Sequence, residues 1–181
     1  MRQRTDLRKT VYISLFTALI AVGGYLSIPL PLSPVPIVLA DFFVMLSGLL
    51  LGGSAGAASV GLLFILSLIG LPVLAGGGAG IGVYLGPTGG FLFGYLACVL
   101  VVGVLSNRGK PGRIKDLAAL IMGNLCLYSS GVVWLKILFK ISWAEAVALG
   151  LVPFIGGAVV KIIAAIVLAE IIRSRFIKED H

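Results

Sequence analysis

The sequence predicts an all-α integral membrane protein built as a bundle of six transmembrane helices. Three observations support this fold class. Hydrophobic residues make up 59% of the 181 residues and charged residues only 12%, whereas about a quarter of the residues of a soluble domain are charged. The hydrophobic residues form long blocks, and the charges lie in short runs between them. One buried core cannot take up so many apolar side chains, so lipid must cover many of them.

The first three helices are delimited by proline and glycine. A membrane-spanning helix needs about 20 apolar residues, and the first is predicted over about 11–28. It ends at a proline-rich stretch, residues 29–36, which we interpret as a rigid loop because proline cannot continue a helix. The second helix, about 37–51, is short for a span. Gly52 and Gly53 then supply a tight turn into the third helix, about 54–69.

A glycine-rich segment, residues 75–82, separates the third and fourth helices. It is too flexible to span a membrane and too apolar for a solvated linker, so we expect a mobile lid or a pocket wall. The fourth helix is predicted over about 87–105, because Pro87 suits a first helical turn. The fifth and sixth follow over about 117–139 and 146–172, and residues 1–181 are expected to form a single domain.

Basic residues predict the orientation of the bundle. Six spans return both termini to the same side, and a cytoplasmic location for the termini places every basic run on the cytoplasmic side, as the positive-inside rule requires. The net charge of +7 therefore reflects membrane topology and not a nucleic-acid-binding face. The three runs are Arg2, Arg4, Arg8 and Lys9; Arg108, Lys110, Arg113 and Lys115; and Arg173, Arg175 and Lys178.

The start of the chain resembles a secretory signal, with basic residues before an apolar block. The apolar run is too long for such a signal, and no small-residue cleavage site clearly ends it. We therefore expect the first helix to remain in the mature protein, in a multi-pass membrane location.

Lys161 is the most informative single residue, because it lies near the middle of the sixth predicted helix. An ionisable side chain inside a membrane helix is costly and usually faces the interior of the bundle. We interpret Lys161 as a cation that meets an anionic or strongly polar ligand. The alternative is a lysine paired with Asp41 or a backbone carbonyl for packing alone. Asp41 either binds ligand or only stabilises the N-terminus of the second helix.

Further candidate ligand-binding residues come from a glycine-rich helix start and from the fifth helix. The stretch 86–91 opens a helix with unpaired amides, and its glycines would let a ligand approach the backbone, although close helix packing is the alternative. Asn124 and Tyr128 lie one turn apart and present hydrogen-bonding groups to one face, although Tyr128 also suits a core. The full candidate set is Asp41, Gly77, Tyr84, Gly86, Thr88, Gly89, Gly90, Asn124, Tyr128 and Lys161.

A strip of small residues on the first helix permits close approach of another helix. A partner surface and packing within the chain are equally open interpretations of this strip. Its members are Ser14, Thr17, Ala18 and Ala21.

The sequence offers no set of catalytic or metal-ligating residues. Gly109-Lys110-Pro111 lacks the spacing of a phosphate-binding loop, and His181 is the last residue. Cys98 and Cys126 lie in apolar stretches without the short spacing of a metal or redox site. We therefore expect neither an enzyme, nor a bound metal, nor a cofactor.

Six short stretches spread over much of the chain form a further pattern. They are Ala18-Leu-Ile-Ala-Val-Gly23, Pro34-Val-Pro-Ile37, Ser47-Gly-Leu-Leu-Leu-Gly52, Gly70-Leu-Pro-Val73, Ala75-Gly-Gly77 and Gly86-Pro-Thr-Gly-Gly-Phe91. This pattern resembles the BioY family, the biotin-specific substrate-binding subunits, or S components, of energy-coupling factor transporters. The resemblance covers nearly the whole chain, and its last motif is highly specific.

The resemblance implies a six-helix subunit of a prokaryotic plasma membrane, with a vitamin pocket near the outer face. It implies two kinds of partner, a transmembrane coupling protein and two cytoplasmic ATPases that supply ATP hydrolysis. The strip containing Ser14 and Ala18 matches the place where such subunits dock on the coupling protein.

Two positions depart from the family pattern. Ala40 stands where the family commonly has Gln, and Ala158 stands where it usually has Asp, three residues before the lysine. Both lost groups are polar, and a pocket without hydrogen-bond partners for a polar ring binds that ring less well. Biotin is therefore the first expectation for the ligand, and lipoate, whose dithiolane ring needs no hydrogen bonds, is the alternative.

Overall fold

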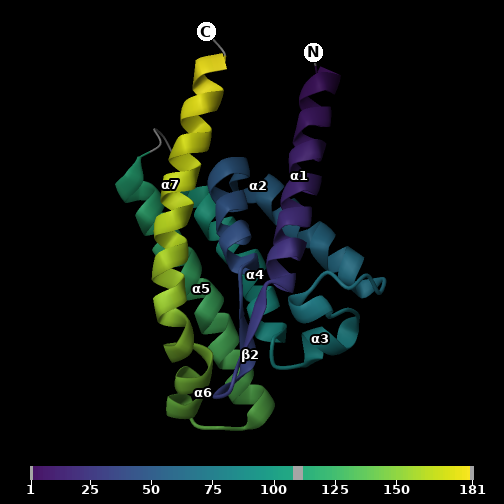
Figure 1. Cartoon of the computed structure of the whole chain (residues 1–181), viewed down its shortest axis with the longest axis vertical. Helices are drawn as coiled ribbons and strands as arrows, with labels where there is room; N and C mark the ends of the chain where they lie inside the picture. Colours follow the sequence, from purple (N-terminus) through teal and green to yellow (C-terminus); the bar gives the residue numbers. More distant parts are fainter. Residues whose placement is uncertain (1, 108–111, 180–181) are drawn as a thin grey trace.

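The structure, a computed structural model, describes residues 2–107 and 112–179, and within them the side chains of 7–107 and 112–175. The helices run along one long axis, and the two ends of the chain lie at the same end of the molecule (Figure 1). The predictions on residues 108–111 and 181, and on the side chains of Arg2, Arg4 and Lys178, fall outside the described residues.

Within the described residues, five stretches of helix are long and apolar enough to cross a membrane. They include α1 (Arg2–Tyr25), α2 (Ala40–Leu68), α4 (Gly89–Ser106), α5 (Arg113–Phe139) and α7 (Ile155–Glu179). Within α2, Gly52 has φ +82° and ψ 177°, a conformation that interrupts the helix. The chain rises through the first arm of α2 and descends through the second (Figure 1), so six helical rods form the bundle and the predicted fold class is confirmed.

The two arms of α2 pack closely, because small residues lie where they meet. A Cβ at Gly56 would stand 3.3 Å from the backbone of Ser47 in the other arm. At Gly103 of α4, a Cβ would overlap the backbone of Gly52 and Gly53 at the turn itself. Glycine is therefore required where α4 crosses the turn of α2.

The connections differ from the sequence prediction in two places. The proline-rich stretch, which was predicted as a rigid loop, is a two-stranded antiparallel hairpin of β1 (Ser27–Leu30) and β2 (Ser33–Val38). Both strands of such a hairpin are edges, where a proline without an N–H is tolerated. The predicted helix 146–172 is divided into α6 (Trp143–Gly150), a 3₁₀ turn (Val152–Phe154) and α7, because Pro153 interrupts the helical hydrogen bonds.

The glycine-rich segment between α2 and α4 is partly ordered into short elements. It contains a 3₁₀ turn, η1 (Ala75–Gly77), and a five-residue helix, α3 (Ile81–Leu85). Both lie in the half of the molecule opposite the chain ends, together with the β-hairpin and α6 (Figure 1).

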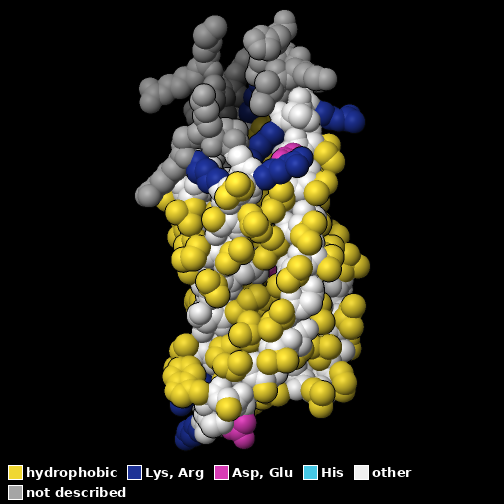
Figure 2. Space-filling model, turned by 90° about the vertical axis from the view of Figure 1, so that its left-hand side faces the viewer, with side chains coloured by type: hydrophobic (Ala, Val, Ile, Leu, Met, Phe, Trp, Pro, Cys, Tyr) yellow, Lys and Arg dark blue, Asp and Glu magenta, His cyan; other side chains and the backbone are white. Residues whose placement is uncertain are grey.

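The surface has the charge distribution of a membrane protein. Hydrophobic side chains cover the middle of the face seen in Figure 2, and charged side chains gather toward the two ends of the long axis. Many large apolar side chains are exposed, among them Ile163, Val160 and Val167 of α7. Lipid is the solvent that such a surface requires.

Replacing Gly103 by Ala should destabilise the protein by about 1–3 kcal/mol, because the new methyl group would force α4 away from the turn of α2. Gly61→Ala is the matched control, since no described atom lies within 4 Å of its Cβ position. Thermal unfolding in detergent measures both. Equal midpoints for the two variants would contradict the proposed close crossing.

Candidate ligand-binding pocket

A pocket lies in the half of the molecule opposite the chain ends, between the β-hairpin, α1, α2, α4, α5 and the start of α7. Its walls are mainly aliphatic and aromatic, with a few polar groups. This composition is typical of a small-molecule site, in which apolar walls provide affinity and a few polar groups fix orientation. The apolar walls include Val35, Leu74, Phe91, Leu92, Tyr95, Leu127, Tyr128 and Phe154, and the polar groups include Asp41, Thr88 and Lys161.

Lys161 and Asp41 form a buried ion pair at the edge of this pocket. Lys161 Nζ lies 2.8 Å from each carboxylate oxygen of Asp41 and donates a further hydrogen bond of 2.6 Å to the backbone oxygen of Val38. The side chains are only 11% and 7% exposed, respectively. Asp41 also accepts a hydrogen bond from the Phe42 amide. The pairing that the sequence left as an alternative therefore exists, and both partners line the pocket.

This geometry uses the full donor capacity of the lysine. An ammonium group has three N–H donors, and the contacts to Val38 and to the two oxygens of Asp41 account for three acceptors. A carboxylate that enters the pocket must therefore replace one of these acceptors. Recognition of an anion at Lys161 is an exchange of partners and not an addition.

Thr88 and Tyr128, which the sequence indicated as ligand-binding candidates, also line the pocket. Thr88 Oγ1 is 3.4 Å from the backbone oxygen of Val83, and this long contact leaves the hydroxyl able to meet a ligand. Tyr128 packs its ring against Phe91 and Phe154, with centroids 6.4 and 6.1 Å apart. The ring is therefore both part of the core and part of the wall.

The glycines at the start of α4 serve helix packing, and they are not among the lining residues of the pocket. A Cβ at Gly89 would overlap the backbone of Tyr84, and one at Gly90 would overlap Trp134 of α5. Gly86 accepts a 2.9 Å hydrogen bond from Trp134 Nε1 through its backbone oxygen. Because these glycines have no side chains, neighbouring protein atoms can lie against their backbone. This is the close helix packing that the sequence left as an alternative to ligand binding.

Gly77 and Tyr84 also lie outside the lining set. Gly77 adopts φ +82° in η1 against the ring of Tyr25. Tyr84 is buried, and its hydroxyl shares a 2.6 Å hydrogen bond with Ser67. Burial raises the pKa of Tyr84 above its ordinary value, so the group stays neutral. Both residues support the loop behind the pocket wall.

Asn124 faces a separate groove between α5 and α7, which Tyr128 and Ala158 also line. Its Nδ2 donates to the backbone oxygen of Leu120 and to the sulfur of Met45, at 2.9 Å each. Its Oδ1 is buried and has no partner among the described residues. Thus Asn124 and Tyr128 share a helix face, but only Tyr128 reaches the central pocket.

The small-residue strip on α1 is divided between two faces. Ser14 and Ala18 are exposed, and Ala21 is half-buried. Thr17 is buried and donates from Oγ1 to the backbone oxygens of Ile13 and Ser59. Thr17 therefore packs α1 against α2 and is not available to a partner, because a threonine on a membrane helix satisfies its hydroxyl on the nearest backbone.

Sequence reasoning missed several aromatic wall residues. Phe91 and Tyr95 lie one turn apart on α4, and this i, i+4 spacing could have identified them. Phe154 enters the pocket from the turn that Pro153 creates before α7, and no local pattern indicates its direction. Of the two positions that depart from the family pattern, Ala40 lines the pocket and Ala158 lines only the groove.

Comparison with known proteins identifies similar chains along nearly the full length. The BioY family matches residues 1–178. A biotin transporter BioY of Thermotoga maritima is 37% identical over 90% of this chain and 94% of its own. One of Lactococcus lactis is 32% identical over 97% and 95%. The crystal structure of a biotin S-component from an ECF-type ABC transporter matches with a TM-score of 0.87 and 31% identity, covering 96% of this chain and 95% of that one.

Lys161→Met should lower the stability of the ligand-free protein by about 3 kcal/mol or more, because it leaves the Asp41 carboxylate buried without its cation. Adding Asp41→Asn should restore part of the loss, because the unpaired charge is then removed. Thermal unfolding in detergent of the two single variants and the double variant measures this. A double variant that loses the sum of the two single losses would refute the pairing.

Proposed function

Because this chain belongs to the BioY family, we propose that it is the substrate-binding subunit of an energy-coupling factor transporter and that it binds biotin for import. It is a multi-pass membrane protein. The observation that carries the proposal is the Lys161–Asp41 pair in the wall of an otherwise largely apolar pocket. Biotin matches this arrangement, since it joins a carboxylate to an apolar chain and a compact ring.

In this mechanism the carboxylate of the vitamin takes over part of the coordination of Lys161. A charge-assisted hydrogen bond is worth about 1.5–3 kcal/mol, and the new bond offsets the loss of one contact to Asp41 or Val38. The ring system of the ligand packs among Phe91, Tyr95 and Tyr128. No covalent step is required of this chain.

Lipoate is the second candidate ligand, and one observation favours it. Ala40 gives the pocket a methyl group where a polar side chain would meet a ureido ring. Titrating purified protein with biotin and with lipoate separates the two. Binding of lipoate without binding of biotin would overturn the assignment of biotin and would keep the class of transporter.

We further infer that both chain ends are cytoplasmic and that the pocket opens outward, in the plasma membrane of a prokaryote. The chain ends share one end of the molecule, and the pocket lies in the opposite half. The partners are then a transmembrane coupling protein and two cytoplasmic ATPases, which hydrolyse ATP and so open the pocket inward. Ser14 and Ala18, exposed on α1, are the proposed docking positions.

Lys161→Ala should weaken biotin binding by at least about tenfold, because the carboxylate loses its charge-assisted bond. Isothermal titration of the purified, folded variant measures the change. Lys136→Ala is the matched control, since Lys136 lies over the ring of Trp143 and outside the pocket. Unchanged affinity in Lys161→Ala would defeat the role given to this residue.

Ala18→Leu should abolish co-purification with the coupling protein and leave biotin affinity unchanged, because the larger side chain prevents close helix approach on an exposed face. Ala118→Leu, at an exposed position of α5, is the control and should retain the partner. Retention of the coupling protein by Ala18→Leu would show that α1 does not dock through this position.

A further inference from the structure

The helix that carries Lys161 is fastened to the bundle at a second place. Arg173 lies on the same helix, α7, about 18 Å farther along its axis at 1.5 Å per residue. Like Lys161, it binds one buried carboxylate and one backbone carbonyl, here those of Asp116 and Leu49. Both fastenings hold α7 to the rest of the bundle, one beside the pocket and one toward the chain ends.

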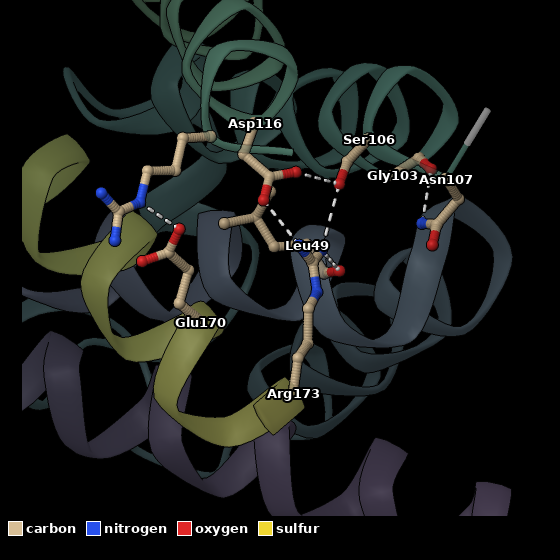
Figure 3. Close-up of polar contacts among 8 residues, drawn as sticks. Leu49, Gly103, Ser106, Asn107, Asp116, Glu170 and Arg173 are labelled. Carbon is tan, nitrogen blue, oxygen red and sulfur yellow. Dashed lines mark hydrogen bonds and ion pairs between the residues drawn. The ribbon is translucent and has the colours of Figure 1, made fainter. Parts of the chain in front are cut away.

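Arg173 joins four helices, as Figure 3 shows. Its Nη1 lies 2.5 Å from Asp116 Oδ2 on α5, and its Nη2 donates to the Leu49 oxygen on α2 at 2.6 Å and to Ser106 Oγ on α4 at 3.2 Å. Ser106 in turn donates to Asp116 Oδ1 at 2.6 Å. The Asp116 side chain is 2% exposed and that of Arg173 21%. We call Arg173, Asp116 and Ser106 the inner clamp.

The break in α2 explains why a carbonyl is available to this clamp. Gly52 interrupts the helix shortly after Leu49, and the last carbonyls of a helix have no amide partners within it. In an apolar membrane interior such a carbonyl needs another donor. Arg173 supplies it, so the clamp also closes the first arm of α2.

A second ion pair also joins α5 to α7, but it is exposed to solvent. Arg113 of α5 bonds to Glu170 of α7, with side chains 78% and 36% exposed (Figure 3). Each partner lies three residues before the corresponding residue of the inner clamp, on the same helix. An exposed pair contributes about 0–1 kcal/mol, so the buried clamp holds this end of α7.

The rest of α7 packs loosely. In the most apolar part of Trp143–Arg175, 17% of the residues are buried, against 61% in α4. At Gly156 and Gly157 no described atom lies within 4 Å of the Cβ position, and apolar grooves lie on both sides of the helix. The buried contacts of α7 here come from the small side chains of Ala158, Ala165 and Ala169, so the bonds of Lys161 and the clamp are the polar fastenings that position Lys161 beside the pocket.

We propose that Arg173 and Asp116 are positioning residues for ligand binding: they hold the inner half of α7 in place while Lys161 exchanges Asp41 for the carboxylate of the ligand. Ligand exchange weakens the fastening beside the pocket, and the clamp then determines where Lys161 lies. This inference rests on the proposed function, because it requires a carboxylate ligand at Lys161.

A double-mutant cycle tests the coupling between the two fastenings. Biotin affinity is measured by titration calorimetry for the wild type, Asp116→Asn, Lys161→Met and the double variant. Asp116→Asn should weaken binding about fivefold or more when Lys161 is present, the lower end of coupling between sites, and less than about twofold when Lys161 is replaced. Residues this far apart otherwise contribute additively, so equal losses in both backgrounds, or no loss in either, would overturn the proposal.

Glu170→Gln is the matched control, since it removes only the exposed pair of the same helices. It should leave affinity unchanged, and a loss as large as that of Asp116→Asn would also overturn the role of the clamp. If Asp116→Asn does not fold, Arg173→Lys, which keeps the charge but loses the forked geometry, takes its place in the cycle with the same expected dependence on Lys161. A wild-type protein that binds no biotin overturns the assignment of biotin as the ligand, whereas additivity in a biotin-binding protein refutes this inference alone.

Discussion

The structure depends on the need to satisfy a cation buried in a membrane bundle. Lys161 lies among apolar helices, where an ammonium group is retained only with acceptors close by. Asp41 and the Val38 carbonyl supply them. These acceptors come from the start of α2 and the end of β2, so the ion pair fixes the hairpin, α2 and α7 relative to one another. Residues of these three elements line the pocket together with residues of α1, α4 and α5.

The need to give every buried polar group a partner also explains irregular parts of the backbone. In lipid, each peptide group must find its partner inside the protein, and two departures from helix lie where another group supplies the bond. The prolines of residues 29–36 lie in a hairpin whose two strands pair with each other. The break at Gly52 lies beside the guanidinium of Arg173. Cations on α7 thus act at both ends of the first arm of α2, at Asp41 and at Leu49.

The sequence predicted those features that depend on the free-energy cost of placing polar and charged groups in lipid. The six rods follow from the lengths of the apolar blocks. The pairing of Lys161 with Asp41, which the sequence left as an alternative, follows from the cost of an unpaired charge. Other features depend on what lies opposite a residue. The sequence alone does not distinguish a glycine that packs against another helix from a glycine that faces a ligand. At Gly90 the position of Trp134 shows that the glycine serves helix packing. Likewise, the Ser59 carbonyl opposite Thr17 determines which face of the α1 strip is buried. The hairpin was missed because the closely spaced prolines of residues 29–36 were interpreted as a rigid loop, and proline within a run argues against a strand.

The exchange of partners at Lys161 also shapes what the pocket can select. Lys161 is already neutralised by Asp41. The free energy that a ligand carboxylate gains at Lys161 is therefore only the difference between two similar bonds, and its entry weakens the bond of Asp41 to the lysine. Net affinity must then come mainly from burial of the apolar chain and ring among Phe91, Tyr95, Leu127 and Phe154, at about 25 cal/mol per Å². Under the proposed function, the lysine sets the orientation of the ligand and selects for a carboxylate, whereas the aromatic walls set the strength of binding. The identity of the ring is thus read mainly by shape, and the methyl group of Ala40 makes hydrogen-bonded recognition at that wall weaker still.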